Sequence, residues 1–348
     1  MRRSSSLLLV GVLVLAGAAI YSIRSGLDYR RYAADVVEEL TYYPSGRLLK
    51  VADLGFTSLV ADVMWLRGIQ YYGEHRSSDQ RYPLAEHIFS SITNLDPGFI
   101  GAYRFGAIVI SEDAGSPAAA IDLLRKGLRS NPDRWELPFD LGFIYFIDLN
   151  DYARAAHYFK FASHTRGSPD VARRFTAFAY RKAGRSDMAR ALWEEIRRSS
   201  GNEVMRETAE FSIKNIDLEK GLETAARAVE EYSARHGTLP PDLGALVRDG
   251  LLASLPPDPF GGAYFLDPTT GTVSSTTKAT EQSGQAERTL DKAVRRFAGQ
   301  RGRLPQDLAE LKNQGFIAEI PIVPGTEATY DPATGSVAYR LEPHKMRQ

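Results

Sequence analysis

Side chains that could do chemistry are few in this sequence, and their spacing does not favour a joint site. His157 and His164 lie seven residues apart on one expected helix, too far to bind one metal ion without further ligands. His75 and His87 fall in different expected helices. We interpret all four as ordinary surface or core histidines and expect no metal site.

Sequence motifs of enzymes are also missing. No G-x-S-x-G, H-E-x-x-H, Walker A or G-x-G-x-x-G pattern occurs, so hydrolase, zinc-protease and nucleotide chemistry have no support. The chain has 0 cysteines, which excludes disulfides, thiolate zinc sites and iron–sulfur clusters. Carboxylates such as Asp62, Glu86 and Asp113 are spread through expected helices, which leaves a glycosidase-type pair open without favouring it. Asp258 and Asp267 are interpreted as turn residues. We therefore expect no enzyme, no cofactor and no small-molecule substrate.

Composition sets the class of protein. The chain has 348 residues, enough for two or three domains, and hydrophobic residues make up 43% of it. Lys and Arg together number 43, as do Asp and Glu, so the formal net charge is zero. Without a basic field to neutralise phosphates, the chain is not expected to bind nucleic acid.

The N-terminus carries an apolar run that could enter a membrane. Leu7 to Ile23 contains no charged residue, follows Arg2 and Arg3, and ends at Arg24. As a helix it is just long enough to span a bilayer. A cleaved signal peptide is the main alternative, because Ala16-Gly17-Ala18 would serve as a small-residue cleavage site, and a buried soluble helix is the third. We favour a retained membrane anchor with export of everything that follows.

Internal repeats dominate the middle of the chain. Alanines recur at 85, 120, 155 and 189, and a large residue follows each by four positions, at Phe89, Leu124, Phe159 and Trp193. Small residues are expected to hold the close-packing position of the preceding helix in each unit, at Gly73, Gly106, Gly142 and Ala177. From about 66 to 201 the sequence therefore resembles a tetratricopeptide-repeat (TPR) solenoid of about four helix pairs, which must stack because one pair cannot bury its own apolar face.

A second, longer repeat follows. The pattern around Gly237-Thr238-Leu239-Pro240 recurs at Gly302-Arg303-Leu304-Pro305, and Asp267-Pro268-Thr269-Thr270-Gly271 recurs at Asp331-Pro332-Ala333-Thr334-Gly335. Each copy predicts a helix, a short second helix and a β-hairpin with a turn that ends in glycine. Between the copies, Ser274 to Gln285 is rich in Ser, Thr and Gln and is predicted to be a solvated linker.

The first copy resembles the C-terminal half of the major pseudopilin of type II secretion systems. The resemblance rests on Gly237-x-Leu239-Pro240 and on the run from Leu255 to Tyr264, and it covers about 45 residues. The methylation motif and the acidic calcium-binding loop of that family are missing, so neither filament assembly nor a calcium site is implied. The second copy is more degenerate.

The expected fold is mainly α: a TPR helical-repeat solenoid after an N-terminal transmembrane helix, followed by two small α+β pseudopilin-like modules. The expected domains are 1–24 as anchor or signal sequence, 25–65 as stem and leading helices, 66–201 as TPR solenoid, 202–273 as capping helix and first module, 274–285 as linker, and 286–348 as second module.

A peptide groove is the one functional site that the sequence suggests. TPR proteins bind partners on the face formed by the first helix of each pair. The candidates there are Tyr103, Phe139, Phe143, Phe146, Arg174, Phe178 and Arg181. Two interpretations stay open: these aromatics fill the core, or they line an aromatic and basic groove for a peptide. In the second case Arg174 and Arg181 favour an acidic or C-terminal carboxylate ligand.

The functional expectation follows from these elements. We expect a membrane-tethered TPR scaffold that holds partner proteins through the concave face of the solenoid, in the bacterial inner membrane with a single pass and with the bulk of the chain on the periplasmic side. Its pathway would be a secretion or pilus-type assembly, as the pseudopilin resemblance implies. The alternatives are a subunit that self-assembles through the pseudopilin-like modules and an envelope enzyme with an unrecognised site.

Overall fold

The computed structural model describes residues 49–50, 54–268, 270–342 and 346. The apolar run Leu7–Ile23 and most of the expected stem lie outside these residues. Among the helices that are described, none is both long enough and apolar enough to cross a membrane. The chain divides into two compact units between Leu192 and Trp193, and each unit is considered separately below.

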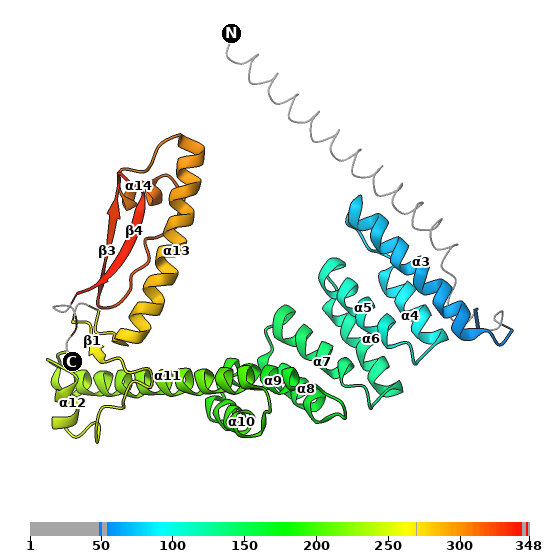
Figure 1. Cartoon of the computed structure of the whole chain (residues 1–348), viewed down its shortest axis with the longest axis horizontal. Helices are drawn as coiled ribbons and strands as arrows, with labels where there is room; N and C mark the ends of the chain where they lie inside the picture. The colour runs from blue at the N-terminus through cyan, green and yellow to red at the C-terminus, as the bar shows by residue number, and fades with distance from the viewer. Residues whose placement is uncertain (1–48, 51–53, 269, 343–345, 347–348) are drawn as a thin grey trace, which may run out of the picture. The chain divides into compact units, whose positions relative to one another are not determined.

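Unit 1 is built from antiparallel helices joined by short turns, as the repeat pattern predicts (Figure 1). Two of its helices end in a π-helical segment, η1 or η2, in which the backbone hydrogen bonds span five residues instead of four. The elements are α3 (Thr57–Ser77), α4 (Ala85–Leu95), α5 (Ile100–Ile108), η1 (Val109–Asp113), α6 (Pro117–Ser130), α7 (Glu136–Phe143), η2 (Ile144–Asp148), α8 (Tyr152–His164) and α9 (Asp170–Lys182), followed by α10 (Ser186–Ser199), within which the unit boundary falls.

Small residues allow the helices of unit 1 to approach closely. The four repeated alanines are all 0% exposed. A Cβ atom on Gly106 would lie 2.6 Å from the Phe89 ring, and one on Gly142 would lie 2.5 Å from the Phe159 ring. Close approach at these two glycines is therefore confirmed.

The expected close contact at Gly73 in the first pair is wrong. A Cβ atom on Gly73 would meet nothing within 4 Å, whereas one on Gly68 would lie 3.1 Å from Ile88. Gly68 thus occupies the close-packing position of α3. The spacing rule failed here because α3 is longer than the first helices of the following pairs, and Gly73 lies closer to the end of its helix than Gly106 does to the end of α5–η1.

The turn inside each pair repeats with the same register. Gln80, Gly115, Asn150 and Gly184 all have positive φ, and each stands five residues before the buried alanine of its pair. Because only glycine and a few polar residues adopt this backbone conformation at low cost, the turn directs the second helix back along the first in the same way each time. The same turn therefore sets the same arrangement of the two helices in each pair.

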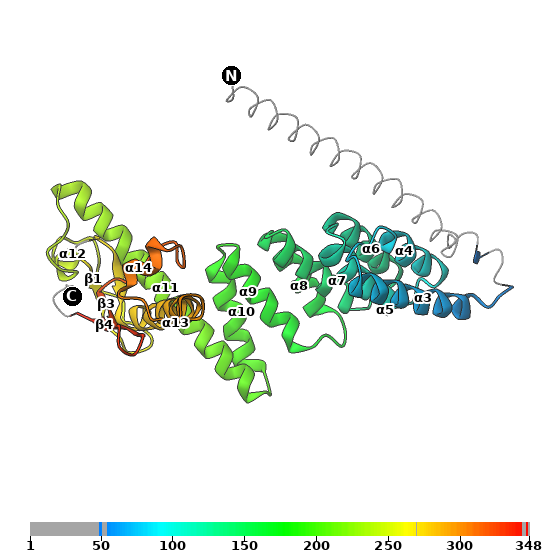
Figure 2. The ribbon, with the colours of Figure 1, turned by 90° about the horizontal axis from the view of Figure 1, so that it is seen from above.

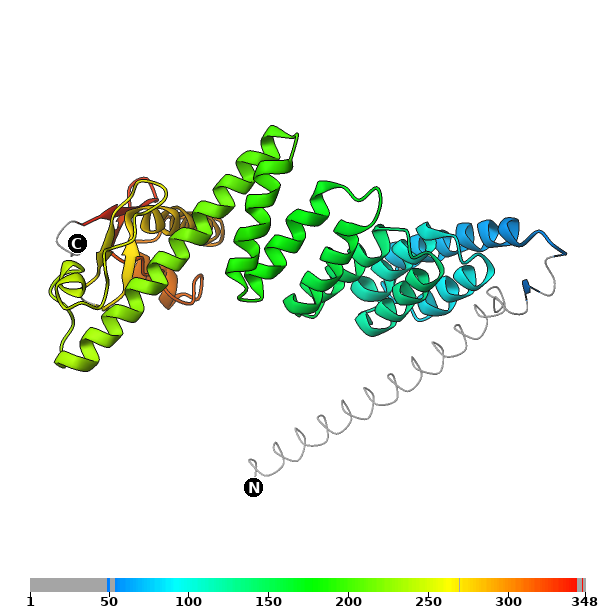
Figure 3. The same cartoon turned by 90° about the horizontal axis from the view of Figure 1, so that it is seen from below.

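The helices of unit 1 lie in two layers. Second helices contact each other, as α4 does α6, and first helices contact each other, as α5 does α7 and η1 does η2. Figures 2 and 3 show α3 to α9 following one another along the unit. The α5–α7 side is therefore the face on which the expected groove should lie.

Unit 2 contains the same set of elements twice. Each copy consists of a long helix, a short helix and a two-stranded antiparallel hairpin, so the predicted order is confirmed. The first copy has α11 (Glu203–His236), α12 (Gly244–Arg248), β1 (Tyr264–Leu266) and β2 (Val273–Ser275), and the second has α13 (Thr276–Arg301), α14 (Leu308–Asn313), β3 (Thr326–Asp331) and β4 (Ser336–Leu341).

The two copies have matching cores. Val229, Leu243 and Leu246 form the core of the first copy, and their counterparts Val294, Leu308 and Leu311 form the core of the second. The two long helices end in the same left-handed glycine, at positions 237 and 302. The internal repeat seen in the sequence is thus a repeat of structure.

The predicted linker over 274–285 is wrong. These residues complete β2 and form the first part of α13, and the Ser275 hydroxyl caps that helix by accepting a hydrogen bond from the Lys278 backbone N–H at 3.0 Å. Ala279, Ser283 and Ala286 lie on one face of α13 and are buried. Small side chains allow close packing on that face, and small residues are also common in linkers, so the amino-acid composition alone did not distinguish the two.

The two copies also share a common core. Phe265 of β1 is 0% exposed and packs in one cluster with Ala279, Ala286 and Val323. Beside this cluster, the Gly325 backbone N–H donates to the buried Asp267 carboxylate at 3.2 Å. Asp267 therefore does more than shape its turn, because it also joins the first copy to the second.

Candidate functional site

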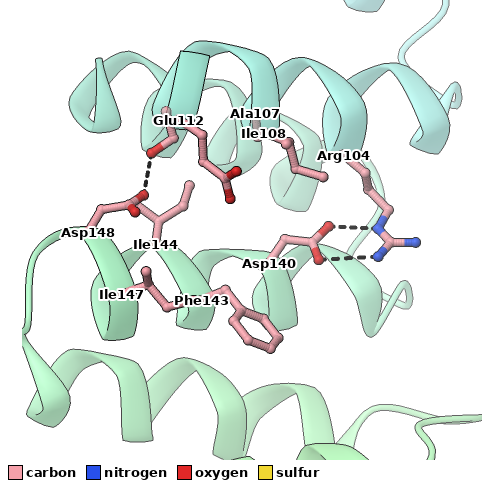
Figure 4. A pocket seen from close by; sticks show the side chains of 10 residues that line it. Arg104, Ala107, Ile108, Glu112, Asp140, Phe143, Ile144, Ile147 and Asp148 are labelled. Carbon is pink, nitrogen blue, oxygen red and sulfur yellow. Dashed lines mark hydrogen bonds and ion pairs between the residues drawn. The ribbon is translucent and has the colours of Figure 1, made fainter. Parts of the chain in front are cut away.

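A cavity of about 170 Å³ opens between α5–η1 and α7–η2, on the layer of first helices (Figure 4). Ten side chains line it, five from each helix, and each of the five positions of the first helix recurs 36 residues later in the second. The pairs are Arg104 and Asp140, Ala107 and Phe143, Ile108 and Ile144, Ser111 and Ile147, and Glu112 and Asp148. These pairs are one residue out of register with the 35-residue repeat of the alanines and turns, so the cavity lies between facing sides of two successive first helices.

One end of the cavity is closed by an ion pair. Arg104 donates from Nε and from its second terminal nitrogen to the two Asp140 carboxylate oxygens, at 2.6 and 3.2 Å. Burial raises the pKa of Asp140, and the Arg104 guanidinium opposes that rise. The hydrogen bond to Asp140 raises the pKa of Arg104. This two-pronged geometry holds α5 against α7 and neutralises both charges.

The opposite end is acidic. The Ser111 hydroxyl donates to Asp148 Oδ2 at 2.5 Å, so η1 and η2 are joined there. In Figure 4 the Glu112 carboxylate extends from η1 into the space between the two helices. No Lys or Arg lines this end, since Arg104 is the single basic residue of the lining.

The wall between these ends is apolar and accessible. Ile108 is 48% exposed and Ile147 is 59% exposed, although both belong to helices that pack in the unit. Single exposed apolar residues are ordinary on protein surfaces. Two of them around one cavity, in neighbouring repeats, indicate a surface suited to contact with another molecule.

Phe143 connects the cavity to the core. It lines the cavity and also packs with Phe139, Phe159 and Phe175, and every pair of rings among these four lies within 5.7 Å centroid to centroid. The cluster joins α7, α8 and α9. One wall of the cavity is therefore held rigidly by a packed aromatic core.

The π-helical segments explain the length of the repeats. The Ala114 N–H donates to the Val109 carbonyl at 2.8 Å, and the Leu149 N–H donates to the Ile144 carbonyl at 3.2 Å. Each π turn accommodates one extra residue, and the alanine spacing is 35 across α5–η1 and across α7–η2 but 34 across α9, which has no such segment. The extra residue thus belongs to the two helices that form the cavity.

The structure brings only one of the sequence candidates to the cavity, namely Phe143. Tyr103 as a groove residue is wrong: it is 0% exposed and packs against Gly127 of α6, where a Cβ atom would lie 2.8 Å from its ring. Phe139 is also wrong as a groove residue, because it is 8% exposed within the four-ring cluster. For these two the core interpretation holds.

The remaining candidates lie partly buried outside the cavity lining. Phe146 packs on Tyr152, and Phe178 packs on Phe175. The Arg174 guanidinium lies over the Phe175 ring, 5.7 Å from its centroid. Arg181 is half-buried on the same helix as Arg174. An acidic ligand at Arg174 and Arg181 stays a prediction.

Sequence reasoning missed the polar residues of the site. Arg104, Glu112, Asp140 and Asp148 were not predicted, because isolated charged residues on a helix are usually solvated, whereas an aromatic stripe suggests a groove. A signal was present: charged residues recur 36 apart at both ends of two successive first helices. Within the described ranges, no group of three or more His, Asp or Glu side chains is arranged to hold a metal ion.

Comparison with known proteins yields structural likeness only. No protein-family model matches the chain, and no curated protein matches it by sequence. A structure of MamA from AMB-1 aligns with 41% of this chain and 76% of its own, at 21% identity and a TM-score of 0.32. PilF of Pseudomonas aeruginosa aligns with 56% of this chain and 86% of its own, at 18% identity and a TM-score of 0.35.

The assignment of the fold rests on the helix pairs themselves. Repeated buried alanines, repeated left-handed turns and two layers of alternating helices define an array of TPR-type helix pairs. Such arrays present extended surfaces that bind other proteins.

Proposed function

We propose that this chain is a scaffold that holds a partner protein against the face formed by α5 and α7. The observation that supports the proposal best is the cavity lined by five residues from each of two successive first helices, with accessible Ile108 and Ile147 in its wall. The packed Phe cluster and the Arg104–Asp140 ion pair hold this surface in place before a partner arrives. A preformed surface loses less conformational entropy on binding.

Crosslinking at the cavity tests this function. A photoreactive phenylalanine analogue placed at Ile108 or Ile147 in cells should crosslink one discrete partner. The same analogue at Phe161, which is 43% exposed on the second helix α8, is the matched control. Equal crosslinking from all three positions, or none from Ile108 and Ile147, would contradict a site on the α5–α7 face.

We further propose that the scaffold is tethered to the bacterial inner membrane, with its bulk on the periplasmic side, and that it serves a secretion or pilus-type assembly. The tether is supported by the charge-free run Leu7–Ile23, and the pathway by the resemblance of residues 237–264 to a pseudopilin. Full-length protein should stay with membranes through an alkaline carbonate wash. Soluble protein that begins at Ala19 or Ile20 would instead indicate a cleaved signal peptide.

Self-assembly through unit 2 is the second candidate. Ile322, between α14 and β3, is 86% exposed, and among the described residues each hairpin pairs with no third strand. The photoreactive analogue at Ile322 distinguishes the candidates. A crosslinked homodimer from Ile322, without any product from Ile108 or Ile147, would favour the self-assembling subunit over the scaffold.

A further inference from the structure

The charges that line the cavity are unbalanced. Arg104 and Asp140 neutralise each other at one end, whereas Glu112 and Asp148 line the other. Asp148 accepts a hydrogen bond from the Ser111 hydroxyl, and neither Glu112 nor Asp148 forms an ion pair with any residue between positions 54 and 342 that the structure describes. Two carboxylates therefore face the cavity without a cation.

The size of the cavity limits what can enter. At about 170 Å³ it is smaller than the ~300 to 1,000 Å³ of sites that enclose drug-sized molecules. A single side chain of a bound peptide fits this scale better than a free metabolite does. The peptide backbone would then stay outside, along the α5–α7 face.

The lining determines which side chain suits it. Ile108, Ile144, Ile147 and Phe143 offer apolar contact along the wall, and the carboxylates follow at the end. Lys and Arg are the side chains that combine a long aliphatic stem with a cationic tip. A purely aliphatic side chain would leave the carboxylates without a partner, and an acidic one would be repelled.

We propose that this cavity binds a lysine or arginine side chain presented by a peptide segment of the partner protein. The stem lies along the isoleucines, and the cation pairs with Glu112 and Asp148. This inference rests on the proposed scaffold function and specifies the chemistry of its partner. It is the opposite of the acidic ligand that Arg174 and Arg181 predict for α9.

Selection of peptides on the full-length chain tests the inference. A displayed library of random nonapeptides is selected in parallel on the native chain, on Glu112→Gln/Asp148→Asn, and on the control Asp113→Asn/Asp122→Asn. The control removes two carboxylates from α5–η1–α6 that do not line the cavity. Thermal unfolding of all three confirms that they are folded. A synthetic peptide from the native selection is then measured with its cationic residue intact or replaced by norleucine.

The expected result is enrichment of Lys or Arg at one position, next to apolar residues, on the native chain and the control but not on the cavity variant. Replacement by norleucine should weaken binding about tenfold, because a charge-assisted hydrogen bond is lost. Peptides that bind all three chains with the same cationic content, or that are enriched in acidic residues, would overturn this inference but leave the scaffold function standing. Absence of any selected peptide on the native chain would overturn both.

Discussion

The helix pairs of unit 1 and the duplicated modules of unit 2 are both repeats, but their repeats meet differently. In unit 1 a glycine of one helix pair lies against an aromatic ring of the neighbouring pair, as Gly106 of α5 does against Phe89 of α4, and the first-helix face stays accessible. In unit 2 each copy has its own core, and the ring of Phe265 is covered by the second copy. Stacking thus leaves the first-helix face of unit 1 accessible, whereas in unit 2 the shared cluster buries the surface between the two copies.

The largest loss of stability is expected from a substitution at Gly325, where the two copies of unit 2 meet. This glycine has φ +70°, and a Cβ atom would lie 2.5 Å from the Phe265 ring. Gly325→Ala combines left-handed strain with overpacking and should lower the free energy of unfolding by about 2 to 5 kcal/mol. Gly315→Ala is the control, since Gly315 has φ +74° but open space, and it should cost only about 1 to 2 kcal/mol. Equal losses in chemical denaturation would mean that the contact with Phe265 is unimportant.

A smaller effect is expected in the helix pairs. Gly142→Ala places a methyl group where it overlaps the Phe159 ring, and it should destabilise unit 1 by about 1 to 3 kcal/mol. Gly73→Ala meets nothing within 4 Å and should stabilise the helix by up to about 1 kcal/mol. Opposite shifts in melting temperature are therefore predicted for the same substitution. Stabilisation by both would contradict close packing at Gly142.

The smallest effect concerns the joint between neighbouring pairs and depends on pH. Lys126 of α6 donates from Nζ to the Ser90 carbonyl and to Thr93 Oγ1 of α4, and burial lowers its pKa to about 8 from 10.5. Between pH 8 and 10.5 the unfolded chain binds this proton more tightly, so the free energy of unfolding should rise with pH in that range.

A substitution isolates this contribution. The difference in unfolding free energy between the native chain and Lys126→Met should shift in favour of the native chain as pH increases from 8 to 10.5. Denaturant titrations at several pH values measure it. A difference that does not vary with pH would show that Lys126 is not desolvated in the folded chain.

Regular patterns made much of the fold predictable from sequence. The alanine register located the helix pairs, because these alanines are fully buried where helices pack. The offset between Gly237 and Gly302 located the duplicated modules, because both positions have a positive φ that favours glycine. The order of helix, short helix and hairpin was predicted for the same reason.

The errors have physical causes too. The start of α13 was predicted to be a linker because it is rich in small residues. In the structure Ala279 and Ser283 are buried, and their small size allows close packing of the helix. Tyr103 looked like a groove residue, since an aromatic on a first helix can face either α6 or the open side, and the glycine that decides it, Gly127, is 24 positions away. The helices that line the cavity each contain a π turn with one extra residue, and the alanine spacing of 35 indicates that residue without locating it.

Isoleucine methyl spectra of the full-length chain test the central claim, that the α5–α7 face binds a partner, most directly. The chain is labelled at isoleucine methyl groups and titrated with a peptide retained in the selection. The signals of Ile108 and Ile147 should shift, whereas that of Ile322 in unit 2 should not. Shifts confined to Ile322 and its neighbours, with Ile108 and Ile147 unchanged, would contradict the account.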